Sequence, residues 1–225
     1  MIWLSDDELG FPSHDSANEY GILAIGGDLS PKRLILAYQN GIFPWFNEED
    51  PIIWWSPDPR FVLYPENLKI SKSMRQILRR KVFTITYDTD FESVLRNCQN
   101  IERRGQDGTW ITEEMFEAYL TLHEIGLAHS VEVWQNEELV GGLYGISLGK
   151  CFFGESMFAK VSNASKAGFI TFVQNLASLG FDLIDCQTET KHLKSLGADF
   201  IRRSDFLEYL QKNNQKETWI GKWHF

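Results

Sequence analysis

The chain has 225 residues, a formal net charge of −9 at pH 7, 43% hydrophobic and 24% charged residues. These values are ordinary for a globular protein and leave room for one large domain or two small ones. The acidic balance argues against a protein that coats nucleic acid with its whole surface. No apolar run approaches a membrane span, and the first residues carry acids where a signal peptide needs bases, so we expect a cytoplasmic protein without a membrane segment.

The cysteine and histidine content does not indicate a disulfide framework or a metal site. The three cysteines, Cys98, Cys151 and Cys186, are odd in number, far apart and never spaced as C-x-x-C. The five histidines show no paired spacing of the kind that binds zinc. We therefore expect buried thiols and no bound metal.

The first quarter of the chain differs in composition from the rest. All seven prolines lie between Pro12 and Pro65. Within this part, Ser30 and Pro31 predict the N-cap and the first residue of a helix that Gly41 ends. A serine, a proline and a glycine thus define the limits of this predicted helix.

Three tryptophans follow that helix in Pro-rich segments. Trp45, Trp54 and Trp55 lie where prolines favour loops, which we predict here. Large rings in loops are less easily explained as core than rings on strands or helices. Such rings could line a pocket or stack on a base.

Basic residues cluster next, on a chain that is acidic overall. Six basic residues and no acid occur between Lys69 and Lys81, where a helix from Ser71 to about Arg80 is predicted. Two interpretations stay open at this point. The cluster is either a solvated helix face or a contact for the phosphate backbone of a nucleic acid.

The remaining elements predict an α+β fold in which an antiparallel meander leads into a β-α-β unit. A strand over 82–87 precedes a helix capped by Asp90, and Thr112 caps the next helix. The later elements are a strand over 130–134, a hairpin over 139–158, a helix over 163–178, a strand over 181–187, a short helix over 190–196, a strand over 198–202 and a helix from residue 204.

The hairpin is the segment most suggestive of a functional site. Its two runs flank Gly149-Lys150, a two-residue connection with glycine first, which is typical of a type II′ turn. Glu155 is a single acid among aromatic residues. It either faces water, finds a partner or takes part in chemistry.

The strand over 181–187 carries Asp185 and Gln187 near its end. Since residues i and i+2 of a strand share a face, we expect these two side chains to project side by side. If the strand lies beside the hairpin, Glu155 joins them. The alternative is that a carboxylate and an amide at a strand end have only a structural role.

Several kinds of chemistry are disfavoured by missing motifs. Ser156 lacks the second glycine of a nucleophile elbow, and the chain has no phosphate-binding loop, dinucleotide fingerprint or H-E-x-x-H. A meander followed by a helix and a strand resembles N-acetyltransferases, yet residues 159–166 lack their glycine-rich pyrophosphate loop. Coenzyme A is therefore doubtful, and we expect another acyl carrier and no cofactor.

Seven segments, in order from about Phe11 to about Tyr209, resemble the bacterial leucyl/phenylalanyl-tRNA–protein transferase family. They are Leu23-Ala-Ile-Gly-Gly-Asp-Leu-Ser30, Gly41-Ile-Phe-Pro-Trp-Phe46, Trp54-Trp-Ser-Pro-Asp-Pro-Arg60, Gly108-Thr-Trp-Ile-Thr112, Leu139-Val-Gly-Gly-Leu-Tyr-Gly145, Gly154-Glu-Ser-Met-Phe158 and Leu183-Ile-Asp-Cys-Gln187. Leu143 stands where some members are expected to have methionine, a conservative change.

The resemblance implies a small N-terminal α/β domain and a C-terminal acetyltransferase-like domain with a mixed, mostly antiparallel sheet. We expect the N-terminal domain to combine the Pro/Trp-rich residues 1–65 with the basic helix and strand of 66–110, and the catalytic domain to span 111–225. The implied activity moves Leu or Phe, and also Met, from aminoacyl-tRNA to the N-terminal Arg or Lys of proteins, in the N-end rule degradation pathway. A monomer without cofactor is expected.

The resemblance also implies roles for particular residues. The aminoacyl side chain is expected in a hydrophobic pocket, whose members could instead be plain core: Leu143, Phe152, Met157, Phe169, Phe172 and Ile184. Asp185 is expected to orient Gln187 and to accept or relay a proton, and Gln187 to hold the attacking amine. Glu155 is expected to pair with the cationic acceptor or the aminoacyl ammonium group.

Further residues are expected to bind the tRNA. The terminal adenosine would stack on Trp45 and Trp110, with Tyr38 and Tyr119 beside them. Acceptor-stem phosphates would contact four basic residues, Arg75, Arg79, Arg80 and Lys81.

Two other functions stay open from the sequence. One is a cell-wall aminoacyl-tRNA transferase, although those proteins are usually larger and carry a helical arm. The other is a non-catalytic reader of basic N-termini or RNA ends, which would use the same aromatic loops and acids. The relative preference for Leu, Phe or Met is not encoded in any motif.

Overall fold

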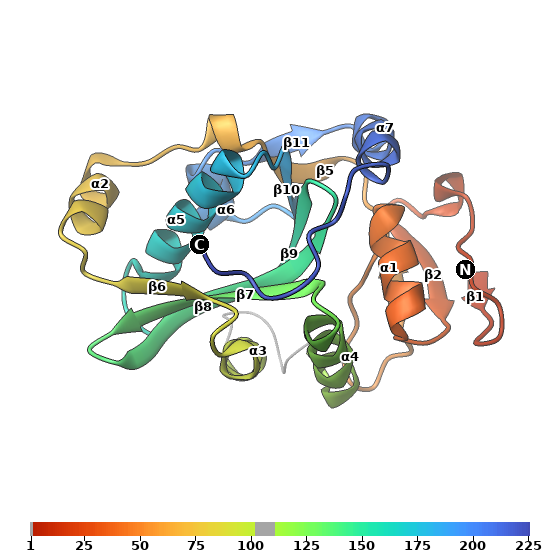
Figure 1. The fold of residues 1–225 in the computed structure, drawn as a ribbon. Helices are drawn as coiled ribbons and strands as arrows, with labels where there is room; N and C mark the ends of the chain where they lie inside the picture. Colours follow the sequence, from red (N-terminus) through yellow and green to blue (C-terminus); the bar gives the residue numbers. More distant parts are fainter. Residues whose placement is uncertain (1, 102–110) are drawn as a thin grey trace.

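Two β-sheets organise the structure, a computed structural model that describes residues 2–101 and 111–225 (Figure 1). Within these ranges the smaller sheet has the strand order β1-β2-β4-β3 and the larger has the order β11-β5-β10-β9-β8-β7-β6. The strands are β1 (Ile2–Leu4), β2 (Ile22–Gly26), β3 (Phe43–Pro44), β4 (Ile53–Trp55), β5 (Arg60–Leu63), β6 (Thr84–Tyr87), β7 (Ala128–Gln135), β8 (Glu138–Leu148), β9 (Cys151–Ala159), β10 (Leu183–Gln187) and β11 (Asp199–Ile201).

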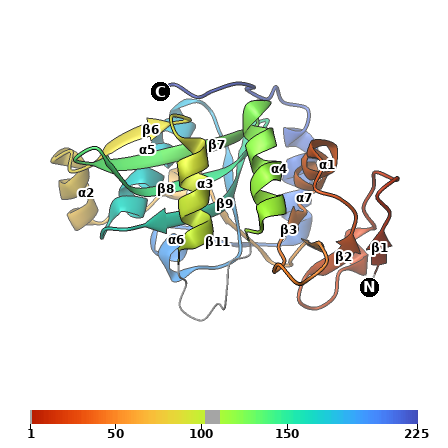
Figure 2. The ribbon, with the colours of Figure 1, turned by 90° about the horizontal axis from the view of Figure 1, so that it is seen from below.

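Helices cover both faces of the larger sheet. The helices are α1 (Pro31–Gln39), α2 (Lys72–Arg79), α3 (Phe91–Asn100), α4 (Glu113–Glu124), α5 (Ala164–Ser178), α6 (Lys191–Ser195) and α7 (Arg203–Asn213). Helix α5 packs on β7 and β8 from one face, and α3 and α4 lie side by side on the other (Figure 2). Among the helices of the described ranges, none is both long and apolar enough to cross a bilayer.

The larger sheet is mixed, as predicted. Strands β9 and β10 run parallel, and the other neighbouring pairs of this sheet run antiparallel. The parallel pair is joined by α5, which is the crossover that a parallel connection requires. The α+β class with a mostly antiparallel sheet is therefore confirmed.

The predicted helix starts are confirmed by their caps. Ser30, Ser71, Asp90 and Thr112 each accept a hydrogen bond from the backbone N–H three residues further on. A side-chain oxygen at this position satisfies one of the free N–H groups at the start of a helix. These four polar N-cap residues thus begin four of the helices.

The predicted hairpin is also confirmed, with β8 and β9 joined at Gly149-Lys150. Gly149 has φ +58, and a Cβ there would lie 2.6 Å from the carbonyl oxygen of Asn213. The Asn213 side chain accepts from the Lys150 N–H at 2.7 Å and donates to the Leu148 oxygen at 2.9 Å. Glycine is therefore required both by the turn and by the close approach of α7.

The prediction that Trp54 and Trp55 lie in loops is wrong. Both belong to β4, and Trp54 is fully buried, with its Nε1–H donating to the Gly26 oxygen at 2.8 Å. Strand β4 has three residues between prolines and β3 has two, so both are too short to show a period-two pattern. These two strands could therefore not be predicted from the sequence.

The larger sheet takes strands from both sides of the domain limit predicted after residue 110. Strands β5 and β6 precede that limit, and β5 pairs with both β10 and β11. The first part of the chain therefore contributes directly to the sheet that carries the hairpin. The limits 1–110 and 111–225 themselves stay a prediction.

Candidate active site

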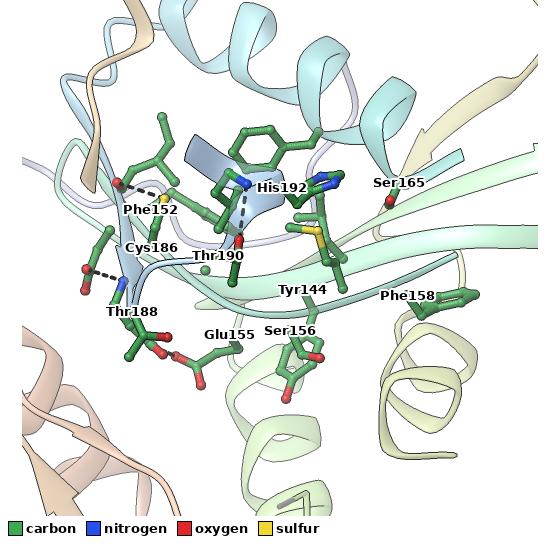
Figure 3. A pocket seen from close by; sticks show the side chains of 18 of the residues that line it. Tyr144, Phe152, Glu155, Ser156, Phe158, Ser165, Cys186, Thr188, Thr190 and His192 are labelled. Atoms are coloured by element: carbon green, nitrogen blue, oxygen red, sulfur yellow. Dashed lines mark hydrogen bonds between the residues drawn. The ribbon is translucent and has the colours of Figure 1, made fainter. Parts of the chain in front are cut away.

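A cavity of about 720 Å³ opens between the hairpin, β10, α5, α6 and β3 (Figure 3). One part of its wall is apolar and another carries polar side chains. The apolar part contains five of the six residues predicted to form a side-chain pocket, Leu143, Phe152, Met157, Phe169 and Ile184. The sixth, Phe172, does not line the cavity but packs behind Phe152, with ring centroids 4.7 Å apart.

A β-bulge in β9 places Glu155 at this cavity. Tyr144 pairs with Ser156 and the next residue, Gly145, pairs with Gly154, so Glu155 is the additional residue. A bulge re-aims a side chain and shifts the strand's alternation by one position. The shift allows Met157 to face the same cavity as Phe152, which strict alternation would forbid.

A second bulge lies in β10, opposite the first. Asp185 pairs with Val62 and Gln187 pairs with Phe61, so Cys186 is the additional residue, and Gln187 has φ +60. The side-by-side projection expected for Asp185 and Gln187 rested on regular alternation. The bulge breaks that alternation and gives the two side chains different partners.

Glu155 is the centre of the polar part of the wall. Its Oε1 accepts from the Tyr38 hydroxyl at 2.8 Å and from Gln187 Nε2 at 2.7 Å, and its Oε2 contacts the Tyr119 hydroxyl at 2.8 Å. Burial raises the pKa of Glu155 to about 7, although donation from these three groups to the ionised carboxylate acts in the opposite direction. The site therefore holds a carboxyl group that can change its protonation state near neutral pH.

Asp185 forms an ion pair with a different residue, Arg60. It is fully buried, and its two oxygens accept from Arg60 Nε at 2.8 Å and Nη2 at 2.6 Å. Its Oδ1 also accepts from the backbone N–H of Gln187 at 3.0 Å, which fixes the backbone of the bulge. Asp185 therefore orients Gln187 through the main chain.

The predicted adenosine-binding residues lie in different environments. Trp45 lines the cavity from the end of β3 and is 36% exposed. Tyr38 and Tyr119 are fully buried, and both hydroxyls contact Glu155. Trp110 lies outside the described residues.

The predicted phosphate-binding residues are exposed and do not line the cavity. Arg75, Arg79, Arg80 and Lys81 lie on α2 and the turn after it, and all four are exposed. Figure 1 shows α2 at the end of the molecule opposite α1. These residues can therefore contact only a ligand that extends beyond the cavity lining.

Two site residues were missed by sequence reasoning. Arg60 lies directly before an apolar run and is 1% exposed, between the rings of Phe43 and Phe206. A cation next to an apolar strand was the available signal, because such a charge needs a buried partner. His192 lines the cavity from α6, and burial lowers its pKa; no sequence pattern distinguished this residue.

The sequence matches a known family along most of its length. The family described as leucyl/phenylalanyl-tRNA protein transferase matches residues 62–211, and the N-terminal domain of that family matches residues 27–58. A leucyl/phenylalanyl-tRNA--protein transferase from Flavobacterium johnsoniae is 58% identical over 211 residues, covering 94% of this chain and 99% of that protein. The protein of the same name from Syntrophus aciditrophicus is 56% identical over 213 residues, covering 95% and 89%.

The likeness to solved structures is weak. A GCN5-related N-acetyltransferase-like protein from Streptococcus suis gives a TM-score of 0.37 at 13% identity, covering 80% of this chain and 67% of that one. The sequence matches are far stronger. On the family match and the two relatives, this chain belongs to the leucyl/phenylalanyl-tRNA protein transferase family.

Proposed function

We propose that the chain transfers Leu, Phe or Met from aminoacyl-tRNA to the N-terminal Arg or Lys of proteins, as a step of N-end rule degradation. The name of its relatives supports aminoacyl transfer to proteins. The observation that carries the proposal is a single cavity with an apolar wall beside Glu155 and Gln187. Its volume of about 720 Å³ is several times that of one side chain, so donor and acceptor can occupy it together.

The apolar wall selects the donor by shape. Leu143, Met157 and Phe169 present flexible or flat surfaces without a hydrogen-bonding group. Side chains unbranched at Cβ can extend into such a pocket, whereas Val and Ile place a methyl group at its entrance. Misfits of this kind cost about 1 to 3 kcal/mol each in hydrophobic sites.

Gln187 holds the attacking amine at the other end of the cavity. Its backbone is fixed by Asp185 and its side chain by Glu155. A free α-amino group has a reference pKa of about 7.7 to 8.0, so a sizeable fraction is already neutral near pH 7. We do not assign Asp185 the proton-accepting role that was expected from the sequence, because Arg60 binds both of its oxygens.

The rest of the tRNA extends from the cavity mouth. Trp45 is exposed enough for the terminal adenosine to stack on its ring. The arginines of α2 then contact phosphates without reading sequence, which fits a donor chosen by its aminoacyl group. Binding of the tRNA is expected to depend strongly on salt.

Transfer of a labelled amino acid tests this function. The full chain is incubated with tRNA charged with labelled leucine and with a peptide that starts with Arg, either free or acetylated. Label in the free-Arg peptide alone supports the transferase. Binding of the charged tRNA without any transfer would favour a non-catalytic reader of basic N-termini or RNA ends.

A further inference from the structure

Three oxygen-bearing groups form a closed ring beneath the cavity wall. The Tyr38 hydroxyl contacts Glu155 Oε1 at 2.8 Å, and the Tyr119 hydroxyl contacts Glu155 Oε2 at 2.8 Å. The two hydroxyls contact each other at 2.5 Å. Each member of the ring therefore touches both others, and the three groups come from α1, α4 and β9.

The number of protons decides whether all three contacts can be hydrogen bonds. Each contact needs one proton, and two phenols supply two. If Glu155 is ionised, both phenol protons point at the carboxylate, and the contact between the hydroxyls has none. A protonated Glu155 supplies the third proton and closes the ring.

The hydrogen bond from Gln187 determines the direction in which protons are donated around the ring. Gln187 Nε2 donates to Glu155 Oε1 at 2.7 Å, so Oε1 acts as an acceptor. The carboxyl proton then lies on Oε2 and is donated to Tyr119, which donates to Tyr38, which donates to Oε1. Buried rings of this kind are strengthened by mutual polarisation.

The surrounding charges favour the same protonation state. Burial and the nearness of Glu155 raise the pKa of both Tyr38 and Tyr119, so the phenols stay neutral. Asp185, from β10, adds a negative charge that disfavours ionised Glu155 and is itself paired with Arg60. From β8, Tyr144 is the further titratable group that faces the ring.

From this ring we propose that Glu155 is a neutral carboxylic acid that gives a proton to the leaving ribose oxygen and recovers one from the attacking amine, with Tyr38 and Tyr119 as positioning residues. This assignment rests on the proposed aminoacyl transfer. It replaces the roles expected for all three residues, an ion pair for Glu155 and a place beside adenosine for the tyrosines.

The step balances without another reactant. The neutral amine nitrogen forms the C–N bond, and the ester C–O bond breaks with its electron pair on the ribose oxygen. Glu155 gives its proton to that oxygen, and the resulting carboxylate takes the proton that the nitrogen sheds on becoming an amide. Glu155 is then protonated again, and the ring closes.

Infrared difference spectra of the substrate-free chain test the protonation state. The wild-type chain and Glu155→Gln are compared across a pH series. We expect a neutral carboxyl band at about pH 6 that Glu155→Gln removes and that disappears around pH 7. If the spectra show Glu155 as a carboxylate at about pH 6, the proposal is overturned.

Removing one hydroxyl from the ring should shift the pKa of Glu155 in the direction opposite to the shift expected for an ordinary carboxylate. In Tyr38→Phe the neutral acid loses two hydrogen bonds of the ring and the ionised form loses one, so by this count the pKa of Glu155 should fall and its band should disappear at lower pH. An ionised carboxylate that merely lost a donor would show a pKa that rises, which would refute the ring. Tyr119→Phe gives the same comparison if Tyr38→Phe does not fold. Tyr87→Phe, which removes a buried hydroxyl bound to Asn175, is the control and should leave the band unchanged.

Steady-state transfer rates then test the catalytic role. Glu155→Gln keeps a hydrogen-bond donor but cannot move a proton, so kcat should fall about 10²-fold or more, with less change in KM. The alkaline loss of wild-type rate should follow the infrared titration and shift to lower pH in Tyr38→Phe. If Glu155→Gln retains the wild-type rate, the role is excluded. If neither the wild-type chain nor any variant transfers label but the carboxyl band titrates as expected, the proposed transfer function is wrong. The protonated ring would still be supported by the infrared data.

Discussion

Arg60 and Asp185 are 125 residues apart in the chain and form a bidentate ion pair that is almost fully buried on both sides. Arg60 also donates to the Gly41 oxygen at 3.0 Å. The pair thus connects the segment between α1 and β3 with β5 and with the bulge that positions Gln187. The position of the candidate site depends on a contact between the first and last thirds of the chain.

Breaking this pair should destabilise the protein strongly. Removing one partner leaves an uncompensated buried charge, so Arg60→Leu should lower the free energy of unfolding by about 3 to 5 kcal/mol in urea titrations. Arg60→Leu combined with Asp185→Leu should cost less than the sum of the two single changes. Arg202→Ala, which breaks the exposed pair with Asp205, is the control, and little change is expected. An equally small effect of Arg60→Leu would contradict the structural role given to the pair.

Narrowing the apolar wall should change the choice of donor. Leu143→Phe adds a ring where the donor side chain is placed, so transfer of Phe should fall more than transfer of Leu, by about 10-fold in the ratio of kcat/KM values. Competition between Phe-tRNA and Leu-tRNA measures this ratio directly. Leu139→Phe makes the same change on β8 at a position outside the cavity lining and should leave the ratio as in the wild-type chain. An unchanged ratio in Leu143→Phe would exclude this wall as the donor pocket.

The basic residues of α2 should appear in the salt dependence of tRNA binding. Arg75→Ala with Arg79→Ala should weaken binding and reduce the slope of log K against log salt by about 1.4 to 1.8, since each phosphate contact contributes about 0.7 to 0.9. Lys212→Ala removes an exposed cation on α7 and serves as the control. If the slope of the double variant equals that of the wild-type chain, these arginines do not contact the phosphates.

Glu155 should make the stability of the protein depend on pH. Because the pKa of this carboxyl is about 7 in the folded chain and 4.5 without the fold, the folded state keeps the proton to higher pH than the unfolded state. The contribution of Glu155 to the free energy of unfolding therefore falls as pH rises from about 4.5 to about 7, by about 1 to 3 kcal/mol, and levels off above that. Glu155→Gln should be about as stable as the wild-type chain at low pH and more stable at about pH 8, measured by urea unfolding. Parallel stability curves for the two chains would contradict the raised pKa.

The elements with strong local signals could be predicted from the sequence. Ser30, Asp90 and Thr112 begin helices because a side-chain oxygen satisfies free backbone donors, and that chemistry is local. The hairpin was visible because Gly149 permits a conformation that other residues avoid. Five of the six pocket residues that the family resemblance implied line the cavity.

The details of the site depend on contacts that no local pattern encodes. The bulges at Glu155 and Cys186 arise from pairing with β8 and β5, so alternation along β9 or β10 could not reveal them. Arg60 had an apolar neighbourhood in the sequence but no identifiable partner until β5 was placed beside β10. The hydroxyls of Tyr38 and Tyr119 turn to Glu155 because α1 and α4 enclose it, which is a property of tertiary packing alone.

We propose that donor and acceptor meet in one cavity and react directly, without a covalent intermediate on the protein. Burial raises the pKa of the Cys151 and Cys186 thiols, which disfavours either as a nucleophile. The most direct test incubates the chain with labelled leucyl-tRNA in the absence of acceptor, separates the denatured protein, and repeats the incubation with the Arg peptide. We expect no label on the protein at any time, and transfer only when both substrates are present. Label that accumulates on the protein in a one-to-one ratio and then moves to added peptide would contradict it.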